Sequence, residues 1–224
     1  MGEATPLPRP CAYGFDWSGT LCDDLELAYG VSKQLCGQLG MPIEASAEEC
    51  GRHPACNPID DFKSRSRCKP PIAPETFAHL YSERYATAGT ETPPRLFPGV
   101  AAALLAAKKR RPSRIFFIVS ACPWLVINDV VEEAGLSEVF RSLIYSTSDG
   151  KTTKAHVIRT LIRQLDLYQQ ECVYVGDTIG DCQAAKQAGI GFVGVRGYHT
   201  KEMLFDAGAH FVCDSAAELL ERST

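Results

Sequence analysis

The stretch CAYGFDWSGTL, residues 11–21, decides the fold of this chain. Its first five residues form an apolar run that predicts a buried strand, and Asp16 follows directly. Residues just past the carboxyl ends of parallel strands converge on one crevice, even when they are far apart in sequence. Two later apolar runs end in the same manner: Arg114 to Val119 stops at Ser120, and Cys172 to Val175 stops at Gly176, Asp177 and Thr178. The pattern therefore predicts one catalytic site built from these strand ends.

A lysine and a further aspartate extend this predicted cluster. Lys154 opens a helix of apolar periodicity between the last two of these strands. Asp181 follows Asp177 by about one helical turn of 3.6 residues, which keeps both carboxylates near the same end of the sheet. Lys151 is the alternative to Lys154 as the lysine of the site. We favour Lys154 because it begins the periodic helix.

Strands and helices alternate along the second half of the chain, which is typical of a doubly wound, mostly parallel sheet. A helix begins at Pro98-Gly99 and runs to Lys109, before this alternation. Earlier, helical patterns at Asp24–Leu39 and Pro74–Ala86 flank a stretch rich in Cys, Pro and charge. The sequence predicts an α/β fold with a Rossmann-like core at residues 1–21 and 98–224 and a small helical cap domain inserted at 22–97.

Length and composition exclude several classes of protein. The 224 residues, 45% of them apolar, suffice for a full core and a small second domain. No apolar stretch approaches the roughly 18 residues that span a bilayer, and the proline-rich Met1 to Pro10 does not resemble a signal sequence. A formal charge of -4 offers no basic field to nucleic acid. We expect a cytoplasmic protein that binds neither membrane nor nucleic acid, and the oligomeric state stays open.

Ten cysteines without a signal sequence indicate reduced thiols rather than a disulfide framework. Three of them lie in apolar runs and are predicted to pack in the core: Cys11, Cys172 and Cys213. Another group lies in a polar stretch and could supply four ligands to zinc, although its irregular spacing matches no familiar finger: Cys50, His53, Cys56 and Cys68. The alternative is that these are unlinked thiols of the cap.

The segment Gly176 to Asp181, followed by Ala184 to Gly189, is the most specific motif of the chain. Together with the Asp16 loop, Ser120 and Lys154, it resembles the haloacid dehalogenase-like (HAD) superfamily, over about residues 12–213. Most members are magnesium-dependent phosphohydrolases with a Rossmann-like core. The resemblance implies a Mg²⁺ cofactor and a small phosphorylated metabolite as substrate. A 2-haloacid dehalogenase fits less well, since halide release needs neither magnesium nor Asp177.

This resemblance also implies roles for the acidic residues. Asp16 would be the nucleophile that attacks phosphorus and forms an aspartyl-phosphate. Mg²⁺ between Asp16 and Asp177 would neutralise the repulsion between carboxylate and phosphate, since hard cations prefer oxygen ligands. The backbone carbonyl of Ser18 would be the third protein ligand. Asp181 would orient the site or hold a metal-bound water.

The same resemblance implies which residues bind the phosphate group. Ser120 would donate its hydroxyl to a phosphoryl oxygen, and Lys154 would balance the charge during transfer. Gly19 lets the backbone fold close to the phosphate, and Thr20 is expected to secure the tight turn after Asp16. Ser18 belongs to the same phosphate-binding loop.

Ser18 also marks a departure from the family pattern. HAD phosphatases usually carry a second aspartate two residues after the nucleophile, which protonates the leaving oxygen and then activates water. Serine is a poor general base at neutral pH, and the loss of positioned acid–base catalysis typically costs about 10²–10⁴ in rate. Among the histidines, His53 and His79 could approach the site only if the cap closes, whereas His156 and His199 are expected on helix surfaces.

The sequence is compatible with three functions. The first is a Mg²⁺-dependent hydrolase of a small phosphorylated metabolite. The second follows from residues 16–20, which look like the Asp-Trp-Ala-Gly-Thr of phosphonoacetaldehyde hydrolases; these enzymes form a Schiff base through a cap lysine, for which Lys63 is the candidate. The third is a catalytically impaired HAD fold that serves as a phosphate-binding or interaction module.

Overall fold

A computed structural model describes residues 10–41, 43, 46, 71–148 and 152–223 of the chain. Within these residues, six parallel strands form one sheet in the order β5-β4-β1-β6-β7-β8. Their bounds are β1 (Ala12–Phe15), β4 (Ile115–Ser120), β5 (Ile144–Ser146), β6 (Cys172–Gly176), β7 (Gly191–Val195) and β8 (Phe211–Cys213). The predicted apolar runs 11–15, 114–119 and 172–175 therefore become β1, β4 and β6 at the centre of the sheet.

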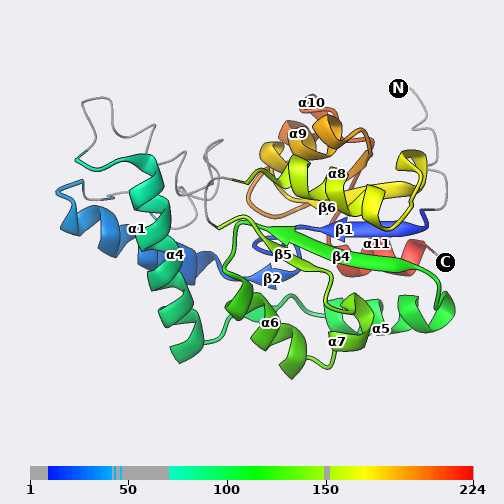
Figure 1. The fold of residues 1–224 in the computed structure, drawn as a ribbon, viewed down its shortest axis with the longest axis horizontal. Coiled ribbons are helices and arrows are strands. Elements are labelled where there is room, and N and C mark those ends of the chain that lie inside the picture. The colour runs from blue at the N-terminus through cyan, green and yellow to red at the C-terminus, as the bar shows by residue number, and fades with distance from the viewer. Residues whose placement is uncertain (1–9, 42, 44–45, 47–70, 149–151, 224) are drawn as a thin grey trace.

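Helices cover both faces of this sheet (Figure 1), which confirms the predicted doubly wound α/β fold. One face carries α8 (Lys154–Gln164), α9 (Ile179–Ala188) and α10 (Lys201–Asp206). The other carries α5 (Val100–Arg110), α6 (Trp124–Glu133), α7 (Ser137–Phe140) and α11 (Ala216–Arg222). A short 3₁₀ turn, η1 (Gln169–Glu171), precedes β6.

The central strand β1 sends its side chains alternately into the two apolar cores. Tyr13 and Phe15 pack on the α5 side, and Ala12 packs on the α8 side. A Cβ atom at Gly14 would lie 2.3 Å from a ring atom of Phe117 and 2.9 Å from a ring atom of Tyr174. Glycine at this position therefore lets the two rings close over the central strand.

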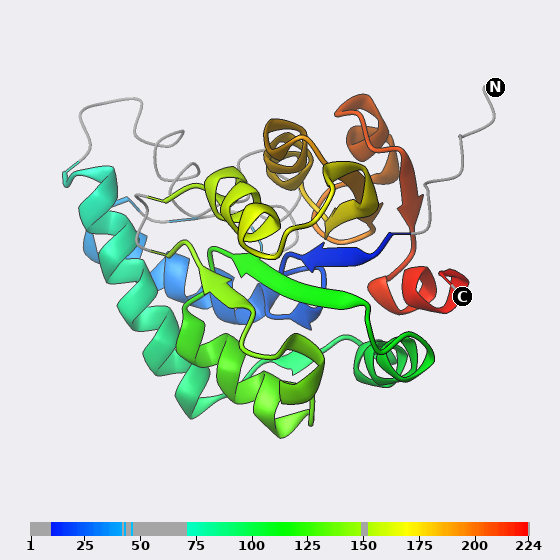
Figure 2. The same cartoon turned by 45° about the vertical axis from the view of Figure 1, so that its right-hand side comes forward.

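The segment between β1 and α5 contains a second small group of elements. An antiparallel pair, β2 (Cys22–Asp23) with β3 (Arg95–Leu96), brackets α1 (Leu25–Gln38) and α4 (Pro74–Glu91). These two helices pack against each other around Leu35, Cys36 and Phe77, at the left of Figure 1. Figure 2 shows α4 beside α6 at one end of the molecule and α11 beside α5 at the other.

The helices in this segment match the sequence patterns, apart from their ends. The predicted Asp24–Leu39 helix is observed as Leu25–Gln38, and the predicted helix that begins at Pro74 continues beyond Ala86 to Glu91. No helix among the described residues combines the length and the apolar character needed to cross a membrane. Cys172 and Cys213 are buried as predicted, but the prediction for Cys11 is wrong, because this residue precedes β1 and is exposed.

Candidate active site

Three aspartates meet at the carboxyl end of the sheet. Asp16 directly follows β1, Asp177 directly follows the neighbouring β6, and Asp181 lies in the first turn of α9. All three are buried, and each offers a carboxylate oxygen within 4.8 Å of those of the other two. The Asp16 backbone N–H continues the β1–β6 pairing by donating to the Val175 carbonyl at 2.9 Å. The topology therefore brings together residues that are up to 165 positions apart.

Lys154 supplies the cation of this cluster. It is the first residue of α8, whose N-terminus is capped by the Thr153 side chain. Its Nζ atom lies 2.9 Å from Asp16 Oδ1 and donates a hydrogen bond to Asp181 Oδ1 at 2.7 Å. Lys151, the alternative lysine, lies outside the described residues. If all three carboxylates are ionised, Lys154 compensates only one of three negative charges within the cluster.

The excess of negative charge in the cluster shifts the pKa values of its members. Burial and then the charge of Asp181 raise the pKa of Asp16 to about 6, although Lys154 opposes the shift. Burial and the neighbouring Asp181 and Asp16 raise the pKa of Asp177 well above its ordinary value. Burial disfavours the charged form of Lys154, but the two carboxylates outweigh it and hold the lysine pKa well above its ordinary value. The site therefore favours the arrival of further positive charge.

The donor set fits a hard divalent cation. The carboxylate oxygens of the three aspartates lie within 4.8 Å of one another, so Asp16 and Asp177 could bind one Mg²⁺ ion with Asp181 beside them. Asp16 Oδ1 is buried and, apart from its ion pair with Lys154, accepts no hydrogen bond within the described part of the chain. A buried carboxylate oxygen with a free acceptor position is an appropriate metal ligand.

Asp177 is held in place from both sides of its carboxylate. The Thr20 hydroxyl donates to Oδ1 at 3.1 Å, and the Tyr198 backbone N–H donates to Oδ2 at 2.8 Å. A Cβ atom at Gly19 would lie 2.3 Å from Oδ2, and Gly19 has a φ of 72°, which glycine adopts without strain. Gly19 and Thr20, expected to serve the phosphate and the turn, thus both contact a predicted metal ligand.

Asp181 has both of its carboxylate oxygens engaged. Its Oδ2 accepts from the Thr178 hydroxyl at 2.6 Å and from the Thr178 backbone N–H at 3.1 Å, while its own N–H donates to the Thr178 hydroxyl. This reciprocal capping box starts α9. Since Oδ1 binds Lys154, Asp181 places the lysine beside Asp16.

Ser120 ends β4, the other strand that neighbours β1. It is buried, and its Oγ atom accepts the Cys122 backbone N–H at 3.2 Å. That bond uses a lone pair and leaves the hydroxyl proton to be donated elsewhere. Ser120 is thus positioned on the same edge as Asp16, on the side opposite Asp177.

Sequence reasoning missed a second carboxylate next to the Asp16 loop. Asp24 is buried and accepts the Ser18 hydroxyl at 2.6 Å. Burial raises the pKa of Asp24, although hydrogen bonds from Ser18, Tyr85 and Tyr198 oppose that shift. In the sequence Asp24 follows Asp23 at a helix start, where an aspartate is an ordinary cap, so no local signal distinguished it.

The predictions for the histidines have mixed outcomes. His156 is exposed on α8, as expected. The expectation for His199 is wrong, because this residue is buried in the turn after β7 and its Nδ1 atom accepts the Ile179 backbone N–H at 2.9 Å. His79 lies on α4, 3.5 Å from Glu83 on the same exposed face. Lys63 and the possible zinc ligands, Cys50, His53, Cys56 and Cys68, lie outside the described residues.

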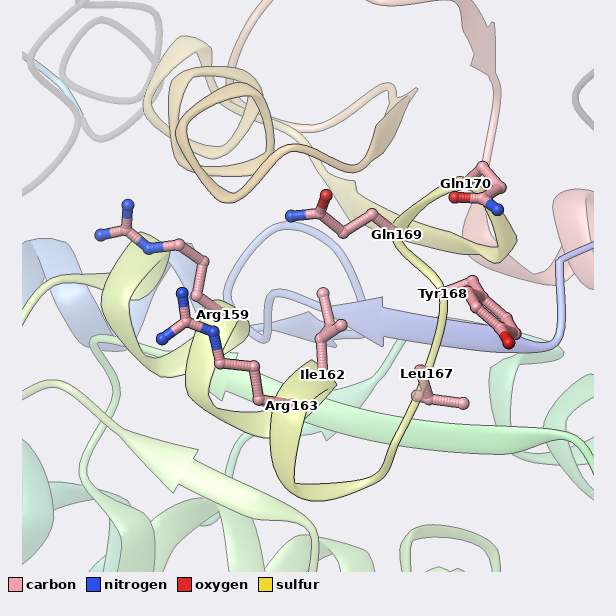
Figure 3. Close-up of a pocket in the computed structure, with 7 residues that line it drawn as sticks. All are labelled: Arg159, Ile162, Arg163, Leu167, Tyr168, Gln169 and Gln170. Atoms are coloured by element: carbon pink, nitrogen blue, oxygen red, sulfur yellow. The ribbon is translucent and has the colours of Figure 1, made fainter.

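The structure also has a pocket of about 390 Å³, whose lining side chains are drawn in Figure 3. It is formed by the carboxyl-terminal part of α8 and the segment before β6, whereas Lys154 and Asp177 lie at the opposite ends of these elements. The pocket is therefore separate from the candidate active site. Its lining residues are Arg159, Ile162, Arg163, Leu167, Tyr168, Gln169 and Gln170.

Solved structures share this fold over nearly the whole chain. A predicted phosphatase from Clostridium acetobutylicum is 23% identical with a TM-score of 0.75, covering 94% of this chain and 96% of that one. A predicted phosphoglycolate phosphatase from Haemophilus somnus is 20% identical with a TM-score of 0.74, covering 97% and 100%. CbbY from Rhodobacter sphaeroides, solved in complex with phosphate, is 24% identical with a TM-score of 0.71, covering 94% and 96%.

The sequence comparison settles the family. No curated protein sequence matches the chain at a significant level. A family model described as haloacid dehalogenase-like hydrolase matches residues 14–195. This range includes Asp16, Ser120, Lys154, Asp177 and Asp181, the residues that the fold gathers at one edge of the sheet. The chain therefore belongs to the haloacid dehalogenase-like hydrolases.

Proposed function

We propose that this hydrolase is a Mg²⁺-dependent phosphatase that acts on a small phosphorylated metabolite through an aspartyl-phosphate at Asp16. The observation that carries the proposal is the buried group of three carboxylates with Lys154 placed against two of them. Three negative charges and one positive charge suit a site that binds a cation and a phosphate together. The names of the structural neighbours, which include predicted phosphatases, agree with this substrate class.

Asp16 performs the first chemical step in this mechanism. A carboxylate oxygen of Asp16 attacks phosphorus, the bond from phosphorus to the leaving oxygen breaks, and an aspartyl-phosphate forms. Lys154 lies 2.9 Å from Asp16 and neutralises charge on the nucleophile and on the transferred group. Ser120, at the end of β4, donates its hydroxyl to a phosphoryl oxygen.

The metal ligands are Asp16, Asp177 and the backbone carbonyl of Ser18. Bound Mg²⁺ supplies charge neutralisation for the carboxylates and the phosphate. Asp181 is already occupied by Lys154 and Thr178, so we assign it an orienting role around the metal rather than direct ligation. Residues 22–97 are proposed as the cap that selects the substrate, with α1 and α4 as its described helices.

The two alternative functions have less support. A phosphonate hydrolase needs a Schiff-base lysine, and Lys63 lies outside the described residues, so this function stays a prediction from the sequence. A binding module without turnover would not need the Lys154 contacts with Asp16 and Asp181. These contacts favour an enzyme.

A panel of phosphorylated metabolites, including phosphonoacetaldehyde, tests the proposal. The wild type should release phosphate with Mg²⁺ and should release none with a chelator. Asp16→Asn should release none in either case, because the amide lacks the nucleophilic oxygen. Asp129→Asn, an exposed carboxylate on α6, is the matched control and should keep full activity. Turnover by Asp16→Asn, or turnover without a divalent cation, would contradict the mechanism.

A further inference from the structure

Asp24 is a buried carboxylate that the mechanism above does not use. It is 2% exposed and follows β2 directly. Its Oδ2 atom accepts hydrogen bonds from the Ser18 hydroxyl, at 2.6 Å, and from the Tyr85 hydroxyl. Its Oδ1 atom accepts the Tyr198 hydroxyl at 3.2 Å. Three hydroxyl donors from three different parts of the fold thus converge on one carboxylate.

The position of Asp24 does not by itself explain these contacts. Asp24 is the N-cap residue of α1, but its side chain makes no capping hydrogen bond. Among the described residues it also forms no ion pair, although burying a carboxylate without a cation is costly. The carboxylate is instead directed at the catalytic loop, which indicates a role there rather than in starting the helix.

The Ser18 hydroxyl donates its hydrogen bond to Asp24. Ser18 lies two residues after Asp16 and is only partly buried. A serine hydroxyl has one proton, and here that proton points to Asp24. The Ser18 oxygen therefore presents its remaining lone pairs as acceptors, with a carboxylate behind it to receive the proton. Serine alone is a poor base, but a serine backed by a buried carboxylate can pass a proton on.

We propose that Asp24 is a positioning residue that acts through Ser18, and that the pair forms a proton relay in place of a single acid–base carboxylate. This inference rests on the proposed aspartyl-phosphate mechanism. When water attacks phosphorus, the bond from phosphorus to Asp16 breaks and Asp16 leaves as a carboxylate. One water proton passes to Ser18 Oγ while the Ser18 proton passes to Asp24 Oδ2. In the preceding step Asp24 begins protonated: its proton passes to Ser18 Oγ while the Ser18 proton passes to the leaving oxygen. Asp24 is then ionised and accepts the Ser18 hydroxyl, ready for the attack of water.

The two tyrosines hold Asp24 in the orientation that this relay needs. Tyr85 comes from α4 and Tyr198 from the turn after β7, so the carboxylate is fixed from outside its own loop. The backbone N–H of Tyr198 also binds Asp177. Tyr198 therefore fixes the positions of both Asp24 and the proposed metal ligand Asp177.

Acid-quench and steady-state kinetics with p-nitrophenyl phosphate and Mg²⁺ test the relay. This substrate has a good leaving group, so the first burst of p-nitrophenol needs little help from an acid. Asp24→Asn and Ser18→Ala should each retain the burst but lower kcat by about 100-fold, within the range of acid–base losses, and aspartyl-phosphate should accumulate. The double variant should be no slower than either single variant, since both residues serve one proton path. Asp23→Asn, the exposed neighbouring carboxylate, should match the wild type.

The outcomes separate the relay from the proposed function. Losses that multiply in the double variant, or an Asp24→Asn variant within threefold of wild-type kcat, would overturn the relay while leaving the phosphatase intact. A wild type that forms no phosphoenzyme and has no turnover would overturn both. If Asp24→Asn does not fold, the kcat values of Ser18→Thr and Ser18→Ala test the relay instead. Thr keeps the hydroxyl and should stay within a few-fold of wild type, and equal activity of the two variants would exclude the relay.

Discussion

Replacing Asp16 by Asn should stabilise the metal-free protein at neutral pH, even though it removes the proposed nucleophile. Burial and the charge of Asp181 raise the pKa of Asp16 from its ordinary value of 3.8 to about 6, and this value already includes the attraction of Lys154. The difference corresponds to about 3 kcal/mol in the free energy of unfolding. Asn mimics the neutral carboxyl group and avoids that cost.

The sign of the effect sets its pH window. Below pH 3.8 Asp16 is protonated in the folded and unfolded chains, so its ionisation costs no stability. Between pH 3.8 and about 6 the unfolded chain releases its proton while the folded chain keeps it, so the free energy of unfolding falls. Above about pH 6 the full penalty is present. For a chain of this length, about 3 kcal/mol corresponds to roughly 6–12 °C in Tm. Lys154 keeps its hydrogen bond to Asp181 in the variant.

Thermal unfolding in a chelator provides the assay. At about pH 7.5, Asp16→Asn should melt above the wild type. The gap should shrink to roughly a third at about pH 4.5 and nearly close only below about pH 3.5. Saturating Mg²⁺ should reduce or reverse the gap, because the wild type binds the ion more tightly. Asp129→Asn serves again as the exposed control. An Asp16→Asn variant that melts at or below the wild-type Tm in chelator at about pH 7.5 would refute the proposed charge imbalance.

Three further predictions follow from the same geometry. Asp177→Ala should weaken Mg²⁺ binding by more than about tenfold in calorimetry, since the loss of outer-shell partners alone costs roughly 10–100-fold; unchanged affinity would exclude Asp177 as a ligand. Lys154→Met should lower kcat by roughly 10²–10³, as the loss of a positioned donor to a developing charge does, and a kcat close to wild type would point to Lys151 instead. Gly19→Ala should abolish activity and lower Tm, because its Cβ would lie 2.3 Å from Asp177 Oδ2 at a φ of 72°. The control Gly37→Ala, in open space on α1, should raise the free energy of unfolding by about 0.5–1 kcal/mol, and similar effects of the two glycine substitutions would contradict the close approach.

The edge of the sheet where the site forms was predictable because its residues end apolar runs. A run such as Cys172 to Val175 reads as a buried strand, and the parallel sheet converts strand ends into spatial neighbours. Lys154 could be placed in the same way, since it begins a periodic helix. The local sequence pattern and the alignment of parallel strand ends thus determine where these side chains lie.

The contacts that tune the site were not predictable from local pattern. The N–H of Tyr198 binds Asp177, but a backbone donor is present at every non-proline residue and leaves no mark in the sequence. Asp24 was hidden because its partners Tyr85 and Tyr198 are 61 and 174 residues away. His199 was misplaced because its partner, the Ile179 N–H, is known only once the turn after β7 folds back on α9.

The central place of β1 in the sheet has a consequence for how the chain is made. β1 is the earliest described strand, yet its two neighbours, β4 and β6, follow it by about 100 and 160 residues. During synthesis both edges of an apolar strand stay unpaired until β4 emerges, and one edge stays unpaired until β6 does. Asp16 and Asp177 therefore come together only late in folding, and a nascent chain that ends before residue 176 leaves an open strand edge prone to aggregation.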